Sequence, residues 1–315
     1  MIRIIFCFII LATIIEGLVL FSGVIDKNEK KEMIHPIVVI TTYASTPAST
    51  PTTIQTTPKK ENEELKKAVE KVLNRSDDKY GIVINNLKTG QEYVMNGDRE
   101  FNPASLYKLW VMATAYKQIQ KGLLDKNEVL SQDIDFLNSE FDIDPTLAEL
   151  TEGGVSMTVK EALERMITQS DNYAALLLSD KLQLSSVSKF LIDNNLMNSK
   201  LGEPPVSTPN DIALFLRKLY KGDIADRDTS NEMIELLKNQ QLNNKLPKLL
   251  EKETVIAHKT GELESFSHDA GIVYSDNGDY IIVIMSETDN RNRANDTIAQ
   301  ISKEVYDYFN NQDNK

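Results

Sequence analysis

The last third of the chain holds the feature that most constrains its fold, three apolar runs separated by turns. Residues 254–261, 268–275 and 279–287 each favour a β-strand, and Asp276-Asn277-Gly278 favours a tight hairpin between the last two. Two further strands are expected within 79–97, on either side of a turn at 87–90. The sequence therefore predicts five strands that come from two distant parts of the chain.

Helical periodicity covers most of the chain between and around these strands. It predicts helices over 61–75, from Ser105 to about Gly122, through 131–201, over 210–220, near 229–239 and over about 294–310. Thr158 and Glu161 form a capping-box pattern before one of them. We therefore expect an α+β fold, a five-stranded antiparallel sheet flanked by helices beside an all-helical lobe.

The N-terminal segment is expected to lie outside the folded part. Residues 1–25 place Arg3 before a long apolar run, which is typical of a secretory signal or a membrane signal-anchor. Glu16 would be costly inside a bilayer, but no good small-residue cleavage site follows, so we favour the anchor. Residues 26–60 are rich in Thr, Ser and Pro and predict a disordered stalk, and 61–315 form one folded domain. We expect an extracytoplasmic protein, tethered to a membrane or secreted if the segment is cleaved.

Composition and charge exclude several classes of partner. The net charge is −12 and no block of Lys and Arg is present, so nucleic-acid binding is not expected. The single cysteine, Cys7, lies in the N-terminal run, and the three histidines lack the spacing of metal ligands. We therefore expect no metal and no cofactor. The folded domain is expected to be monomeric.

A candidate nucleophile stands at the start of the helix that follows Pro103. Ser105 lies at the predicted N-terminus, and Lys108 lies on the same face three residues later. A desolvated, neutral lysine can take the proton from a serine hydroxyl and so activate it. The alternative is a helix-capping serine followed by a solvated lysine. The same spacing occurs at Ser186 and Lys189.

Two further triplets distinguish Ser105 from Ser186. Ser170-Asp171-Asn172 falls between two predicted helices, and Lys259-Thr260-Gly261 ends a predicted strand. Similar triplets, Ser275-Asp276-Asn277 and Lys88-Thr89-Gly90, fall in hairpin turns. Only the set that begins with Ser105 has its three motifs in the right order along the chain and places them at a helix start, in an interhelical turn and on a strand.

With these three motifs, S-x-x-K, S-D-N and K-T-G, the chain resembles the serine β-lactamase and penicillin-binding protein superfamily, and class A β-lactamases most. The resemblance runs from about residue 62 to 310 and implies a β-lactamase/transpeptidase-like fold. It also implies that Ser105 is the acylated nucleophile, that Lys108 accepts its proton, and that Ser170 relays a proton to the leaving nitrogen.

The resemblance implies a second group of residues that hold the substrate. Asn172 would hold the substrate amide, Lys259 would supply positive potential, and Thr260 would bind a carboxylate. Gly261 completes the third motif, and the backbone N–H groups of Ser105 and Glu262 would form the oxyanion hole.

The chain departs from class A enzymes in the loop that carries their deacylating glutamate. Glu203 is the candidate here, but only four residues separate it from Thr208, so the loop is much shortened. Glu203 can equally be a solvated loop carboxylate. The arginine that binds the substrate carboxylate in many relatives, after the K-T-G motif, is also missing. His268 is the nearest polar candidate for its role. We favour the interpretation that His268 is a strand-edge histidine without such a role.

The resemblance thus implies a class A β-lactamase-like serine hydrolase that works through an acyl-serine and hydrolyses or is acylated by β-lactams, with a β-lactam or peptide-like small molecule as substrate. The shortened loop predicts slow deacylation. A D-alanyl-D-alanine carboxypeptidase of the penicillin-binding type is the alternative within the class. A non-catalytic module that binds cell-wall peptide is the alternative from another class.

Overall fold

A computed structural model describes residues 63–310 except 75, 77 and 203. The predicted N-terminal signal or anchor (1–25), the predicted stalk (26–60) and Glu203 lie outside the described residues. In the part of the chain that is described, no helix has the length and apolar character needed to cross a membrane.

The five predicted strands form one antiparallel sheet with the order β2-β1-β7-β6-β5. Its strands are β1 (Lys79–Asn86), β2 (Glu92–Met95), β5 (Ile256–Leu263), β6 (Phe266–Val273) and β7 (Tyr280–Glu287). β1 pairs with β7 along its whole length, which joins the two distant segments of the chain. The predicted sheet is therefore confirmed, and β5 lies at its edge.

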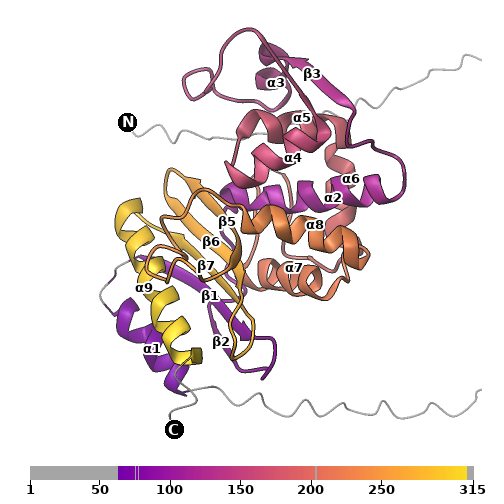
Figure 1. Ribbon diagram of the computed structural model, residues 1–315. Helices are drawn as coiled ribbons and strands as arrows, with labels where there is room; N and C mark the ends of the chain where they lie inside the picture. The colour runs from indigo at the N-terminus through magenta and orange to yellow at the C-terminus, as the bar shows by residue number, and fades with distance from the viewer. Residues whose placement is uncertain (1–62, 75, 77, 203, 311–315) are drawn as a thin grey trace, which may run out of the picture. The chain divides into compact units, whose positions relative to one another are not determined.

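Two helices cover one face of the sheet. They are α1 (Glu63–Leu73) and α9 (Arg291–Asn310), which lie side by side on this face (Figure 1). Alternate residues of the central strands, such as Ile82, Tyr280 and Ile282, point into the core between this face and the two helices. Their neighbours Val83, Ile281 and Val283 point into a second core on the other face. Because both faces are covered, the strands read as continuous apolar runs.

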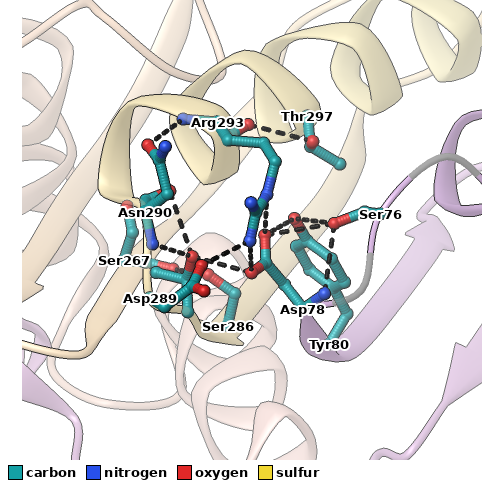
Figure 2. Close-up of polar contacts among 10 residues, drawn as sticks. Ser76, Asp78, Tyr80, Ser267, Ser286, Asp289, Asn290, Arg293 and Thr297 are labelled. Atoms are coloured by element: carbon teal, nitrogen blue, oxygen red, sulfur yellow. Dashed lines mark hydrogen bonds and ion pairs between the residues drawn. The ribbon is translucent and has the colours of Figure 1, made fainter.

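A network around Asp78 fastens α9 to the beginning of β1 (Figure 2). The buried Asp78 carboxylate accepts hydrogen bonds from Arg293 at 2.5 Å and from Thr288 at 2.8 Å. Ser76 and Tyr80 also donate to it. Burial by itself raises the pKa of Asp78, but the hydrogen bonds from Arg293, Thr288 and Ser76 outweigh it and hold the pKa below its ordinary value.

The second lobe packs against the other face of the sheet (Figure 1). Its helices are η1 (Ala104–Tyr107, a 3₁₀ helix), α2 (Lys108–Gln120), α3 (Ile134–Glu140), α4 (Val159–Thr168), α5 (Asn172–Leu182), α6 (Leu184–Asp193), α7 (Pro209–Lys221) and α8 (Arg227–Lys238). The helix α2 is buried along nearly its whole length from Lys108 to Tyr116, so it forms the centre of the lobe. Thr158 caps α4 through Glu161 N–H, and Thr208 caps α7 ahead of Pro209.

The lobe also contains a two-stranded antiparallel sheet, which differs from the helical pattern expected throughout 131–201. Its strands are β3 (Val129–Asp133) and β4 (Gly154–Thr158). They bury few side chains, chiefly Leu130 and Met157, so they leave little hydrophobic periodicity in the sequence. The α+β class and the sheet-plus-lobe plan are confirmed, with this hairpin added.

Candidate active site

The segment that carries Ser105 is held in an unusual backbone conformation. Ala104 has a φ of +45°, a region that non-glycine residues rarely adopt. The Asn102 side chain stabilises this turn, because its Oδ1 accepts a hydrogen bond from Ala104 N–H at 3.0 Å. Strain of this kind tends to occur where a side chain must be aimed. Here the next residue is Ser105, which lines a cavity.

Ser105 and Lys108 share one face of the chain, as the sequence spacing predicts. Ser105 lies in η1, and Lys108 is the first residue of α2. The α-helix thus begins three residues later than predicted, because Ala104–Tyr107 adopt the tighter 3₁₀ form. Residues three positions apart in such a turn share one face, so the side chains of Ser105 and Lys108 leave the backbone on the same side.

Lys108 is fully buried, and its amine is fixed by two short hydrogen bonds. Nζ donates to Ser170 O at 2.6 Å and to Asn172 Oδ1 at 2.7 Å. A neutral amine has two N–H donors, so both are used and its lone pair remains for a proton. Burial lowers the pKa of Lys108 to about 7, although the negative charges of Asp171 and Glu149 act in the opposite direction.

Ser170 lies in the turn between α4 and α5, as predicted, and adopts the left-handed conformation with a φ of +60°. The next residue fastens this turn. Asp171 caps α5 by accepting from Ala174 N–H, and it forms an ion pair with Arg165 at 2.5 Å. The Ser170 hydroxyl therefore lies between two amines: Lys259 Nζ donates to Ser170 Oγ at 2.9 Å, and Lys108 Nζ lies 3.4 Å from it.

Lys259 and Thr260 lie on β5, at the sheet edge that faces the helical lobe. Lys259 is fully buried, and its Nζ also donates to Thr260 O at 2.8 Å. Burial, with the charge of Lys108 adding to it, lowers the pKa of Lys259 well below its ordinary value. The pair therefore holds fewer protons at neutral pH than two exposed lysines, so an amine is available as a proton acceptor.

Gly261 allows β5 to approach the Ser105 segment. A Cβ atom at Gly261 would lie 2.9 Å from Pro103 O, and 3.2 Å from both Leu106 Cγ and His268 Cδ2. His268 supports the same segment from β6, because its Nε2 donates to Asn102 O at 2.8 Å. The glycine of the third motif thus has a structural reason in the close contact between strand and nucleophile segment.

His268, the nearest polar candidate for the role of the missing arginine, has both ring nitrogens engaged by the main chain. It is completely buried, and its Nδ1 accepts from Ser286 N–H at 3.1 Å. Burial lowers the pKa of His268 to about 4, so the ring is neutral at physiological pH. The favoured interpretation, a histidine without a substrate role, agrees with this geometry.

Glu262 contributes its main chain to the site more than its carboxylate. Its side chain forms an ion pair with the buried Lys245 at 2.5 Å. Burial raises the pKa of Glu262, but the hydrogen bond and charge of Lys245 outweigh it and lower the pKa overall. With the carboxylate so engaged, the backbone N–H remains the group that can serve an oxyanion hole.

A cavity of about 520 Å³ opens beside Ser105. Its polar lining includes Asn172, Glu149 and the 262–264 turn, and much of the rest is apolar. The other S-x-x-K serine, Ser186, lies in α6, and the other two triplets lie in the β6–β7 and β1–β2 hairpins. The cavity and the hydrogen bonds thus bring together the three motifs that include Ser105, Ser170 and Lys259. The repeated motifs lie elsewhere in the fold. No cluster of metal-binding side chains occurs among the residues that the structure describes.

Glu149 is a site residue that the sequence interpretation missed. It lies between α3 and β4, lines the cavity, and accepts a hydrogen bond from Asn172 Nδ2 at 2.6 Å. Asn172 can satisfy both neighbours in one orientation only, with Oδ1 toward Lys108 and Nδ2 toward Glu149. No motif marks Glu149, since an acidic residue in a polar turn is usually a solvated side chain.

The comparisons with known proteins agree with this architecture. Residues 64–309 match the model of a family described as the beta-lactamase enzyme family. The chain is 23% identical to the β-lactamase VEB-1 of Pseudomonas aeruginosa over 78% of its own length and 90% of that protein. It is 25% identical to the β-lactamase BRO-1 of Moraxella catarrhalis over 68% of its own length and 74% of that protein.

Among solved structures, PBP-A is similar with a TM-score of 0.71 and 25% identity, over 80% of this chain and 98% of PBP-A. A PBP-A mutant, solved as an acyl-enzyme complex with penicillin G, gives a TM-score of 0.70 and 25% identity, over 79% and 96% of the two chains. With the family match spanning most of its length, the chain belongs to the beta-lactamase enzyme family and is a class A β-lactamase-like serine hydrolase.

Proposed function

We propose that β-lactams acylate this enzyme at Ser105 and that the acyl-enzyme is released slowly. The observation that carries the proposal is the bonding of Lys108, whose two short hydrogen bonds to Ser170 O and Asn172 Oδ1 leave a lone pair on a buried amine beside the nucleophile segment. Such an amine can act as the base that a serine nucleophile requires.

In the acylation step, Ser105 Oγ attacks the carbonyl carbon of the β-lactam ring and its proton passes to Lys108 Nζ. The backbone N–H groups of Ser105 and Glu262 stabilise the oxyanion that forms. The ring C–N bond then breaks, and the leaving nitrogen receives a proton from Ser170 Oγ. The Ser170 hydroxyl is suited to this relay, because it lies between the amines of Lys108 and Lys259.

The remaining site residues hold the substrate. Asn172 binds the substrate amide through its side chain, which Glu149 and Lys108 keep in one orientation. Lys259 supplies positive potential and Thr260 binds the carboxylate of the ring system. Both lie on the edge strand β5.

Slow deacylation follows from the shortened loop between Leu201 and Thr208. Hydrolysis of the acyl-serine requires a water molecule held by a base within hydrogen-bond reach of the ester carbon. The short segment has little chain to support such a base, whether or not Glu203 serves in that role. The expected kinetics are a rapid burst of one product per active site followed by a slow steady rate.

The alternative activity is a D-alanyl-D-alanine carboxypeptidase. The likeness to PBP-A favours it, as does the shortened loop, since slow deacylation of β-lactams suits a peptidase. A non-catalytic module that binds cell-wall peptide is less well supported, because Ser105, Lys108, Ser170 and Lys259 are all present. In either case we propose that the protein works outside the cytoplasm, tethered by residues 1–25 or secreted.

Intact-mass spectrometry after incubation with benzylpenicillin tests the proposal. The protein should gain the mass of one whole penicillin, because the ring opens without loss of a fragment. Ser105→Ala should form no adduct, whereas Ser186→Ala, the matched serine in α6, should form it as the wild type does. An adduct in Ser105→Ala would refute the assignment. The lifetime of the wild-type adduct then measures deacylation, and release of D-alanine from a D-alanyl-D-alanine peptide tests the alternative.

A further inference from the structure

The segment that joins α8 to β5 is attached, at its beginning, to the side of the site that carries the second motif. Residues 240–246 start beside the last turn of α4, where the helix carbonyl groups need donors from outside the helix. Gln240 Nε2 donates to Ile167 O at 2.7 Å, and Gln241 N–H donates to Thr168 O at 2.9 Å. Because α4 ends just before the turn of the second motif, these bonds tie the segment to that turn.

The end of the same segment is attached to the strands that carry and support the third motif. His258 Nε2 on β5 and Asn243 Oδ1 are 3.1 Å apart, and Leu246 N–H donates to Asp269 Oδ2 on β6 at 3.0 Å. His258 and Asp269 are both buried and contact each other, with Nδ1 and Oδ1 2.9 Å apart. The segment therefore connects the two sides of the site from outside the cavity, whose described lining includes none of its residues.

Between these contacts, Lys245 has a buried amine that is held by Glu262. The Lys245 side chain is 1% exposed, and its Nζ donates to Glu262 Oε1 at 2.5 Å. A buried ammonium group is costly unless a group of opposite charge accompanies it, so the pair fixes both side chains. Asn295 Nδ2 on α9 lies 3.5 Å from the same oxygen, which is long for a hydrogen bond. The Glu262 side chain is thus held chiefly by Lys245.

The main chain of Glu262 faces the free edge of β5. Residues of an antiparallel edge strand alternate between those that bond to the neighbouring strand and those whose N–H and C=O groups face the free edge. Thr260 is of the second kind, because its C=O accepts from Lys259 Nζ. Glu262 lies two residues later and faces the same way. The nucleophile segment η1 lies at this edge, where Gly261 brings β5 close to Pro103.

Resting on the proposed acylation at Ser105, in which the N–H groups of Ser105 and Glu262 hold the oxyanion, we propose that Lys245 is a positioning residue for that oxyanion hole. Its ion pair fixes the Glu262 side chain, and residues 240–246 fix Lys245 against α4 and β6. The Glu262 N–H therefore keeps its direction while the attacked carbonyl carbon becomes tetrahedral. A donor held in this way stabilises the transition state without reorganising during the reaction.

The test compares three lysine variants in the rate of single-turnover acylation by benzylpenicillin. Lys245→Met keeps the length of the side chain and removes its charge, and Lys245→Arg keeps the charge. Lys248→Met is the matched control, at a lysine three residues further on that is 44% exposed and paired with Asp296.

Lys245→Met should lower the acylation rate constant by about ten- to a hundredfold, which is less than the loss of a whole oxyanion donor. The dissociation constant of the preceding complex, taken from the concentration dependence of the rate, should change by less than about twofold. Lys245→Arg should restore part of the rate, and Lys248→Met should react as the wild type does. A rate unchanged in Lys245→Met would overturn the inference.

Two further readouts separate positioning from other roles of Lys245. In an acyl-enzyme made with a heavy carbon isotope at the β-lactam carbonyl, infrared difference spectra report the ester C=O stretch. This stretch should move to higher frequency in Lys245→Met, because a displaced N–H polarises the carbonyl group less. The charge of Lys245 also lowers the pKa of Lys259, so a purely electrostatic role would appear as a shift in the pH midpoint of acylation. An unchanged stretch, or a rate loss that disappears at another pH, would contradict the positioning role.

Glu262→Met removes the pair from the other side and keeps the main chain, so the test does not depend on the folding of Lys245→Met. It should slow acylation and shift the ester stretch in the same way, and wild-type values for both would overturn the inference. The double variant replaces the pair by two apolar side chains of similar length, an exchange that folds often tolerate. Its rate loss should be no greater than that of either single variant, because Lys245 acts through Glu262, and additive losses would count against this. Failure of benzylpenicillin to acylate the wild type would instead refute the proposed function itself.

Discussion

The negative charge of Glu149 should control the pH at which Lys108 becomes a base. Two hydrogen bonds and the Asn172 amide separate the Glu149 carboxylate from the Lys108 amine, so the two charges lie about 7 Å apart. Their attraction is about 2.4 kcal/mol at an effective dielectric constant of about 20 and about 0.6 kcal/mol at about 80. Since Glu149 is exposed, a value near the lower end, about 1 kcal/mol, is appropriate.

Glu149→Gln removes this charge and keeps an oxygen that can accept from Asn172. The ammonium form of Lys108 loses stabilisation, so the pKa of Lys108 should fall from about 7 by about 0.5 to 1 unit. The rate of single-turnover acylation, followed by stopped-flow with a chromogenic cephalosporin from about pH 5 to about pH 9, should rise through a midpoint near 7 in the wild type and at lower pH in the variant.

The control is Glu152→Gln, an exposed glutamate three residues along the same segment, which should leave the midpoint unchanged. Asp171 and Lys259, the other charged groups close to Lys108, are the same in all three proteins, so the comparison isolates Glu149. A wild-type midpoint near the ordinary lysine value, or a midpoint that rises in Glu149→Gln, would refute the reasoning. The proton acceptor would then have to be another group, such as Lys259 through Ser170.

Three further predictions concern the parts that support the site. Gly261→Ala should slow acylation by about a hundredfold, because its Cβ would lie 2.9 Å from Pro103 O and displace the nucleophile segment; an unchanged acylation rate would contradict this. Asp78→Asn should lower the free energy of unfolding by about 2 kcal/mol at neutral pH in urea titrations, because the buried partner of Arg293 loses its charge and Arg293 keeps only the exposed carboxylate of Asp289. The folded-state pKa of Asp78 is lowered, so this loss should shrink as the pH falls below 3.8, and a constant difference would count against it. The pKa of His268 is about 6.5 in the unfolded chain and about 4 in the folded protein, so the free energy of unfolding should fall by up to about 3 kcal/mol as the pH is lowered from 6.5 to 4. In urea titrations over this range His268→Gln should make the free energy of unfolding less dependent on pH. An unchanged pH dependence would assign it to other groups.

The sheet and the three motifs could be predicted from the sequence because each leaves a local signal. The strands β1, β6 and β7 are buried on both faces and read as apolar runs, and the cap at Thr208 and Pro209 marks its helix start. The hairpin of β3 and β4 gave no such signal, because its side chains are mostly exposed. Burial on two sides therefore decides which elements can be identified in advance.

Glu149 could not be predicted, because its role depends on a contact across twenty-three positions of the chain rather than on its neighbours. The same is true of His268, whose partner Asn102 lies on a different element. Glu149 holds the motif residue Asn172, and His268 holds the segment ahead of Ser105. Supporting contacts of this kind become visible only when the fold brings distant segments together.

The burial of two lysines side by side explains why the site needs all three motifs at once. Each amine removed from water costs free energy unless oxygen atoms replace the lost hydration. Here the replacement comes from the other motifs: Ser170 O and Asn172 Oδ1 accept from Lys108, while Ser170 Oγ and Thr260 O accept from Lys259. Burial lowers the pKa of both amines, and the charge of Lys108 lowers that of Lys259 further, so the pair need not carry two protons at neutral pH. The proposed roles require a neutral Lys108 beside a charged Lys259. The same arrangement that makes the lysines tolerable inside the protein therefore makes one of them a base, which is the property that activation of Ser105 requires.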